Sequence, residues 1–204
     1  DSELEPHLNE QKKKLKKTAC LNMRKFIYLG PLVFFIATTV YFALPIIQGK
    51  DPRILPSAMI EKNIPDLNLP PLLETKPGIN KQALIGGIQL VNFFSSWCGP
   101  CRTEHDFLMR IRESKTIPLF GINYKDKQKA AKTWLLDLGD PYERIGRDVD
   151  GRTAIDWGVY GVPETYLIDK HGRIQYRHVG PLSESVFKEK IAPVIAALRK
   201  QSNG

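Results

Sequence analysis

Two cysteines separated by two residues are the part of this sequence with the clearest chemical meaning. They lie in Trp97-Cys98-Gly99-Pro100-Cys101, between a buried-strand pattern and a helical one. A thiol at a helix N-terminus is stabilised as thiolate by unpaired amides and the helix dipole. Pro100 at an early helical position loses only an amide that has no partner. Two intervening residues let the second thiol resolve a mixed disulfide, so the spacing predicts a redox-active dithiol.

Two other interpretations of this spacing stay open. Half of a zinc site is the first, although the sequence has no second Cys-x-x-Cys to complete the usual four ligands. His105, four residues after Cys101, would then supply a third ligand. A structural disulfide is the second. The strand before the pair and the helix start favour the redox dithiol over both, and we expect neither a metal nor a cofactor.

Strand and helix patterns alternate around the pair. Apolar runs of strand length occupy residues 89–95, 119–124 and 164–169, and a turn at 170–172 leads to a hairpin partner at 173–178. Apolar residues at helical spacing occupy residues 98–112, 127–138 and 183–198, where Pro193 is expected to kink the helix or split it. This order of elements predicts an α/β domain with a mixed central sheet flanked by helices.

A long apolar segment precedes this domain. Residues 26–47 contain no charge, and as a helix they would span roughly 33 Å, enough for a bilayer core. A cleaved signal peptide is the alternative, but its apolar region is usually about 7–15 residues and ends in a small-residue site. We therefore interpret the segment as a retained single-pass anchor.

The charges around the anchor predict its orientation. Seven lysines and arginines lie between residues 12 and 25, against Lys50 and Arg53 after the anchor, which predicts a cytoplasmic N-terminus. Met23 is an alternative start that would make residues 1–22 an upstream extension. The expected division is a basic tail at 1–25, the anchor at 26–47, a Pro-rich tether at 48–63 and the catalytic domain at 64–204. Cys20 would lie across the membrane from the dithiol.

Composition and charge exclude several other classes of protein. The 204 residues are 42% hydrophobic and 25% charged, which is ordinary for a globular chain. Three cysteines are too few for a disulfide-dense scaffold. The net charge of +8 is spread along the chain, and no basic and aromatic run resembles a nucleic-acid footprint. We expect no nucleic-acid partner.

Several segments beyond the dithiol carry a family resemblance. The dithiol and the later Val162-Pro163 before a strand resemble the thioredoxin fold. The match to the membrane-anchored CcmG/DsbE family, periplasmic thiol:disulfide interchange proteins of cytochrome c maturation, is carried by residues 64–66, 101–105, 121–126, 158–165 and 176–180. It covers roughly residues 64–200, and the segments GVYGVPET and YRHVG are its most specific parts.

The resemblance implies a reductant in the periplasm, anchored in the inner membrane. Its substrate would be the haem-attachment disulfide of apocytochrome c, or of a partner thiol protein, and its electrons would come from a DsbD/CcdA-type membrane donor. It further implies a cis bond between Val162 and Pro163, opposite the dithiol, with Val162, Pro163 and Thr165 binding substrate. A general periplasmic oxidant and a non-catalytic apocytochrome or metal chaperone remain as alternatives.

The dithiol predicts roles for residues near it. Cys98 at the helix start would be the nucleophile, and Cys101, one turn inside and more buried, would resolve the mixed disulfide. Gly99 and Pro100 form the general thioredoxin dipeptide, which this family often replaces, and they help to set the redox potential.

The proton that Cys101 loses needs an acceptor. Asn92 stands six residues before Cys98, where thioredoxins have a buried Asp, and a neutral amide is no base. Glu104, three residues after Cys101, and Glu164, directly after Pro163, are the candidates. We expect Glu164 to be the acceptor, because the fold would place it across from the dithiol.

Overall fold

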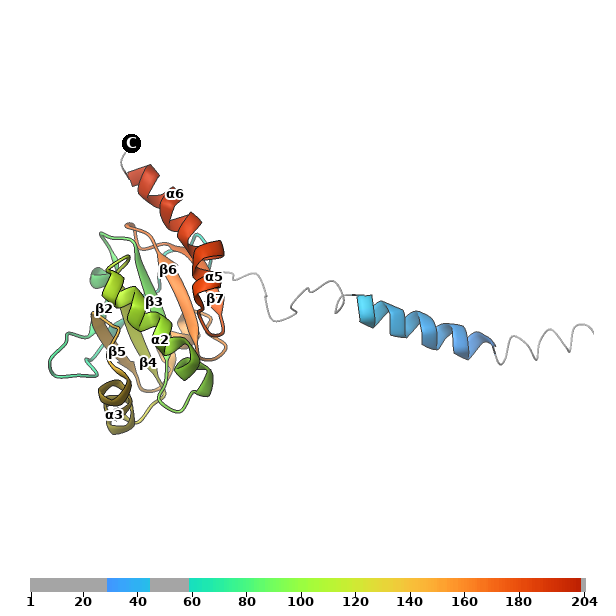
Figure 1. Cartoon of the computed structure of the whole chain (residues 1–204), viewed down its shortest axis with the longest axis horizontal. Coiled ribbons are helices and arrows are strands. Elements are labelled where there is room, and N and C mark those ends of the chain that lie inside the picture. Colours follow the sequence, from blue (N-terminus) through green and yellow to red (C-terminus); the bar gives the residue numbers. More distant parts are fainter. Residues whose placement is uncertain (1–28, 45–58, 203–204) are drawn as a thin grey trace, which may run out of the picture. The chain divides into compact units, whose positions relative to one another are not determined.

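The computed structural model describes residues 29–44 and 59–202 (Figure 1). The chain divides into two compact units at residues 55 and 56. In the first, residues 29–44 form a helix whose apolar side chains are exposed, among them Phe34 and Tyr41. The predicted anchor extends beyond this range at both ends. No helix within the two described ranges is long and apolar enough to cross a membrane.

A five-stranded mixed sheet forms the centre of the second unit. Its strands lie in the order β5-β4-β3-β6-β7. The central strand β3 pairs in parallel with β4 and antiparallel with β6, while β4–β5 is parallel and β6–β7 antiparallel. The bounds are β3 Gln89–Phe94, β4 Leu119–Tyr124, β5 Arg144–Asp148, β6 Glu164–Ile168 and β7 Ile174–Val179. Every residue of β3 is buried, as its apolar sequence predicts.

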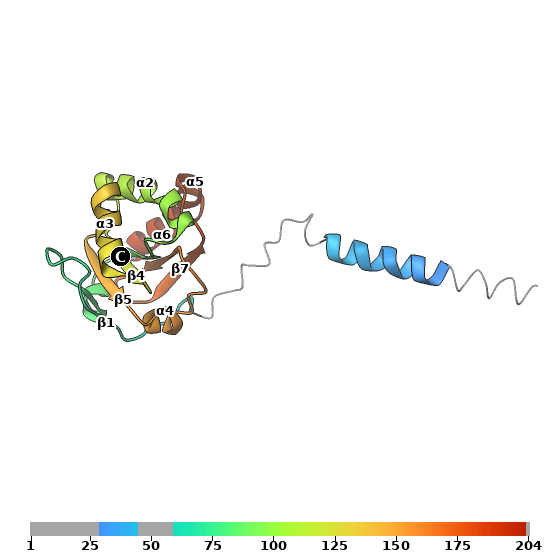
Figure 2. The same cartoon turned by 90° about the horizontal axis from the view of Figure 1, so that it is seen from below.

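Helices cover both faces of this sheet (Figure 2). One apolar core packs α2, α3 and the C-terminal helices against the sheet, and a second core lies under α4 and a small two-stranded sheet, β1–β2. The bounds are β1 Asn68–Leu69, β2 Ile79–Asn80, η1 Lys81–Leu84, α2 Gly99–Ser114, α3 Gln128–Leu138, α4 Arg152–Asp156 and α5 Glu184–Val186. The α/β architecture with a mixed sheet between helices confirms the sequence prediction.

The C-terminal helix is interrupted where its proline requires it. A π-helical segment, η2 Phe187–Ile191, separates α5 from α6 Ala192–Ser202. Pro193, the second residue of α6, lacks the N–H that would bond to the carbonyl four residues earlier, so the preceding turn widens. The prediction that Pro193 kinks or splits this helix is confirmed as an interruption of its α-helical hydrogen bonding. Sequence patterns missed β5 and α4. The apolar pattern of β5 is weak, because it is an edge strand with two arginines in its five residues.

Candidate active site

The two cysteines of the Cys-x-x-Cys segment form a disulfide at the start of α2. Their sulfur atoms are 2.09 Å apart. Cys98 is the N-cap of the helix, and the backbone N–H of Cys101 donates to its Sγ at 3.0 Å. Gly99 and Pro100, the first two residues of α2, are exposed, whereas Cys101 is only 1% exposed. A thiolate at Cys98 would therefore receive one backbone hydrogen bond and the favourable end of the helix dipole.

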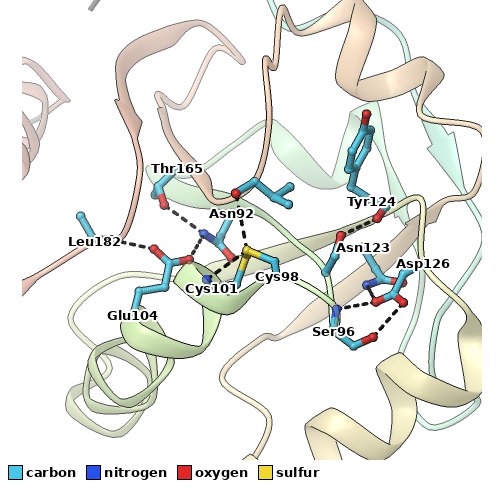
Figure 3. The surroundings of a disulfide bond; sticks show 12 residues. Asn92, Ser96, Cys98, Cys101, Glu104, Asn123, Tyr124, Asp126, Thr165 and Leu182 are labelled. Atoms are coloured by element: carbon cyan, nitrogen blue, oxygen red, sulfur yellow. Dashed lines mark hydrogen bonds between the residues drawn. A yellow bond between two sulfur atoms is a disulfide. The ribbon is translucent and has the colours of Figure 1, made fainter. Parts of the chain in front are cut away.

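The turn that carries Cys98 is held to the end of the neighbouring strand β4 (Figure 3). The backbone N–H and the hydroxyl of Ser96 both donate to the carboxylate of Asp126, at 2.6 and 2.8 Å. Asn123 donates to the same carboxylate at 3.0 Å. The indole N–H of Trp97 donates to the Lys125 carbonyl at 3.1 Å, while its ring stays 60% exposed. The reactive turn is thus fixed in position before any substrate arrives.

The loop before β6 approaches the disulfide from the other side. The Val162–Pro163 bond is cis, which confirms the expectation from the family resemblance. The Sγ of Cys98 lies 3.4 Å from the carbonyl oxygen of Val162. Pro163 is buried, and Val162 is partly exposed. The backbone of Val162 therefore borders the sulfur that the helix start activates.

A buried polar network lies beneath the disulfide and is centred on Asn92. Its amide nitrogen donates to Glu104 Oε1 at 2.8 Å and to Thr165 Oγ1 at 3.1 Å. Its amide oxygen accepts from the hydroxyl of Tyr142 at 2.8 Å. Because Thr165 takes part in this network and is fully buried, its side chain packs inside the protein and contributes no exposed substrate contact.

Glu104 is the carboxylate that this network holds next to the dithiol (Figure 3). It lies three residues after Cys101 on α2 and is only 1% exposed. Its second carboxylate oxygen accepts from the backbone N–H of Leu182 at 2.7 Å. Burial raises the pKa of Glu104 to about 7, although the hydrogen bonds from Leu182 and Asn92 act in the opposite direction. This carboxyl therefore changes charge near neutral pH.

The expected position of Glu164 is wrong. Successive residues of a strand point to opposite faces of a sheet, and Thr165, next to Glu164 on β6, faces the network around Asn92. Glu164 consequently lies on the other face, where Arg177 binds both its carboxylate oxygens, at 2.8 and 3.0 Å. The N–H of Tyr160 and the hydroxyl of Tyr166 also donate to it. Both oxygens of this carboxylate therefore accept hydrogen bonds on the face of the sheet away from the dithiol.

The same ion pair ties down the loop that carries Val162. Arg177 is 5% exposed in its side chain and Glu164 is fully buried. Arg177 also donates to the carbonyl of Gly158 at 3.1 Å, and its guanidinium lies 4.2 Å from the ring centre of exposed Tyr160. Residues 158–164 are thereby anchored at both ends. Arg177 lies in the segment YRHVG that carries part of the family resemblance, but its role could not be predicted from the sequence, because its partner on β6 is known only once the β6–β7 hairpin pairs.

His105 does not form a metal site with the two cysteines. Its Nε2 lies 3.0 and 3.2 Å from the carbonyl oxygens of Gly139 and Leu138, and its ring packs edge-on against Trp134. Burial lowers the pKa of His105, so the neutral ring is favoured. Within residues 29–44 and 59–202, no group of three His, Cys, Asp or Glu side chains could hold a metal ion.

Comparisons with known proteins agree with this geometry. The Redoxin family model matches residues 61–192. The chain is 38% identical over 173 residues to the thiol:disulfide interchange protein DsbE of Allochromatium vinosum, covering 85% of this chain and 93% of the relative. It is 42% identical over 156 residues to the thiol:disulfide interchange protein HelX of Rhodobacter capsulatus, covering 76% and 86%.

A solved structure has a similar fold. The crystal structure of a putative thiol:disulfide interchange protein DsbE from Chlorobium tepidum superposes with a TM-score of 0.57 at 27% identity. The match covers 67% of this chain and 94% of that one. The second unit therefore has a thioredoxin-like fold.

Proposed function

Because this chain belongs to the DsbE and HelX family of thiol:disulfide interchange proteins, we propose that it reduces the haem-attachment disulfide of apocytochrome c, or of a partner thiol protein. The chain is a thiol:disulfide oxidoreductase, and cytochrome c maturation is the process in which we propose that it acts. The observation that carries the proposal is the Cys98–Cys101 pair at the start of α2, with the Val162 carbonyl 3.4 Å from the outer sulfur.

The proposed reaction begins with the reduced pair. The thiolate of Cys98 attacks one sulfur of the substrate disulfide, which forms a mixed disulfide and releases the other substrate sulfur as a thiolate. Cys101 then loses its proton and attacks the sulfur of Cys98, releasing the second substrate thiolate. Two electrons pass to the substrate, and the enzyme is left with the Cys98–Cys101 disulfide of the structure.

We propose that Glu104 accepts the proton that Cys101 loses. The carboxylate is buried one helical turn from Cys101, and its pKa of about 7 lets it accept a proton and give it up again near neutral pH. Asn92 then has a structural reason to be neutral, since its amide donates the hydrogen bond that orients this carboxylate. A carboxylate at position 92 would repel it.

The loop before β6 would bind the substrate. An extended segment beside the substrate cysteine would pair with the backbone of Val162, while Pro163 shapes the groove. Thr165 would act from below, by orienting Asn92. The ion pair between Glu164 and Arg177 would keep the Val162 carbonyl at its distance from Cys98 while the substrate enters and leaves.

The division of the chain follows the same proposal. Residues 1–25 would be a cytoplasmic tail, 26–47 an inner-membrane anchor, 48–63 a tether and 64–204 the periplasmic catalytic domain. The absence of charge from residues 26–47 supports the anchor, as do the exposed apolar side chains of the helix over residues 29–44. An anchor would keep the enzyme on the same membrane surface as a DsbD/CcdA-type electron donor.

Trapping of mixed disulfides tests the proposal. Cys101→Ser should accumulate mixed disulfides with an apocytochrome c or a thiol partner, because the resolving thiol is missing, whereas Cys98→Ser should accumulate none. Covalent labelling of free thiols in cells should find the wild-type pair mostly reduced, and mostly oxidised once the membrane donor is deleted. A pair that is oxidised with the donor present would indicate a general oxidant. Cytochrome assembly that survives the double Ser variant would indicate a chaperone.

A further inference from the structure

A groove beside the dithiol is lined by positive charge that the exchange reaction does not use. It has a volume of about 490 Å³ and lies between the start of α2 and the start of α3. Ser96, two residues before Cys98, and Arg102, directly after Cys101, form its edge toward the dithiol. Lys127 and Lys129 form the opposite edge, and Asp137 is the one carboxylate in its lining.

The three cations of this groove have no anionic partner among the residues that the structure describes. Arg102, Lys127 and Lys129 are exposed, and none of them forms an ion pair with another residue of the described ranges. Lys132, further along α3, is by contrast paired with Glu74. The positive charge of the groove is therefore available to a molecule that binds there.

The position of the two lysines is unfavourable for the helix that carries them. Lys127 is the N-cap of α3 and Lys129 is the second residue of the helix, whose first turn contains no acidic residue and whose cap makes no side-chain hydrogen bond. Cations at a helix N-terminus are disfavoured by the helix dipole. A local arrangement that works against stability is typical of a functional surface.

The wall of the groove includes an aromatic side chain from α3. Trp134 lines the groove and is 4% exposed. The lysines, the arginine and the dipole of α3 all favour a ligand with carboxylate oxygens. A chain segment that reaches Cys98 would cross this groove if it continues toward α3.

We propose that this cationic groove, formed by Arg102, Lys127, Lys129 and Trp134, docks an acidic segment next to the reacting cysteine of a protein partner. The inference rests on the proposed exchange reaction and specifies one kind of partner for it. A carboxylate-bearing segment would be steered to the dithiol by charge and then held beside it. Partners without acidic residues would react by the same chemistry, but more slowly.

Two disulfide peptides test the docking. Both carry an internal Cys-x-x-Cys disulfide, and one is flanked by aspartates where the other has asparagines. The reduced full-length chain, in mild detergent, is mixed with each peptide, and the second-order rate constant of exchange is followed by tryptophan fluorescence. Measurements at about 20 mM and about 500 mM salt compare weak with strong screening.

The double variant Lys127→Glu, Lys129→Glu reverses the charge of one edge without changing a residue of the dithiol. Acidic residues in the first turn favour a helix, so α3 is expected to stay folded, which a thermal melt checks. The matched control is Arg112→Glu, Lys115→Glu. These two exposed cations line a separate groove at the far end of α2.

We expect the wild type to react about tenfold faster with the acidic peptide at low salt, and almost equally with both at high salt. The Lys127/Lys129 variant should lose this preference and the control should keep it. Equal rates in the wild type, a preference retained by the Lys127/Lys129 variant, or the same loss in the control would each refute the docking. If neither peptide is reduced by any of the chains, the proposed exchange itself fails.

Discussion

The Glu104→Gln variant removes the one charge that the network under the disulfide can gain or lose near neutral pH. Glutamine has nearly the same size and keeps one carbonyl oxygen as a hydrogen-bond acceptor. Glu104 is 1% exposed and accepts from Asn92 and from Leu182. The variant therefore changes the ionisation of this position with little change in packing, and one of the two donors then faces the amide nitrogen in place of an oxygen.

The size and sign of the effect follow from burial. Burial raises the pKa of Glu104 from 4.5 to about 7, and a difference of that size corresponds to about 3 kcal/mol. Because the pKa is raised in the folded protein, the protonated form adds stability that is fully present below about pH 4.5. That stability is lost as the pH rises through about 7.

Urea unfolding of the oxidised protein between about pH 4.5 and pH 8 measures this loss. The wild-type free energy of unfolding should fall by up to about 3 kcal/mol across that range relative to that of Glu104→Gln. His105 and His178 also titrate with pKa values lowered by burial, but they are present in both proteins and cancel in the difference. Glu113→Gln, an exposed position on the same helix, is the matched control and should follow the wild type.

Exchange kinetics test the role of the carboxylate separately. If Glu104 accepts the proton of Cys101, the wild-type rate of exchange should rise as the pH passes through about 7. The Glu104→Gln variant should be slower near neutral pH by a factor on the order of 10². Introducing Asn92→Asp into the variant should recover part of the rate, because it returns a base to the network. A stability difference that does not change with pH would refute the raised pKa, and equal exchange rates would refute the proton transfer.

Three further substitutions test the packing around the site, each by thermal and urea unfolding of the oxidised protein. Glu164→Gln leaves the buried guanidinium of Arg177 without its carboxylate and should lower the free energy of unfolding by about 3–5 kcal/mol. The pH profile of exchange should keep its wild-type shape in this variant. A profile like that of the Glu104 variant would contradict the assignment of Glu104 as the proton acceptor. Tyr142→Phe leaves the amide oxygen of Asn92 without its donor and should cost about 1–3 kcal/mol, whereas an unchanged midpoint would mean that the hydrogen bond is dispensable. Gly121→Ala would place a Cβ 2.8 Å from the ring of Tyr142, so it should destabilise by about 1–3 kcal/mol, and a neutral outcome would show that the ring can move.

The sequence alone determined the elements whose causes are local. An apolar run of strand length predicted the buried strand β3, and the dithiol after it predicted the start of α2. The placement of Pro193 predicted the break in the C-terminal helix. These features depend on residues within a few positions of each other, because helix caps, strand periods and missing amides act over one or two turns.

The proton acceptor shows where local reasoning ends. The spacing of three residues put Glu104 near Cys101 on one helix, which the structure bears out. The strand period requires Glu164 and Thr165 to face opposite sides of the sheet, but it does not say which of them faces α2. Only the pairing of β6 with β3 decided this, by bringing Thr165 opposite Asn92.

Tertiary structure alone decided the chemistry of the carboxylates. Glu104 owes its raised pKa to burial beneath the disulfide and its orientation to Leu182, which lies 78 residues further along the chain. Glu164 owes its ion pair to a strand that the hairpin brings back against β6. A carboxylate's neighbours and its exposure to water set its charge, and both depend on which distant segments pack together.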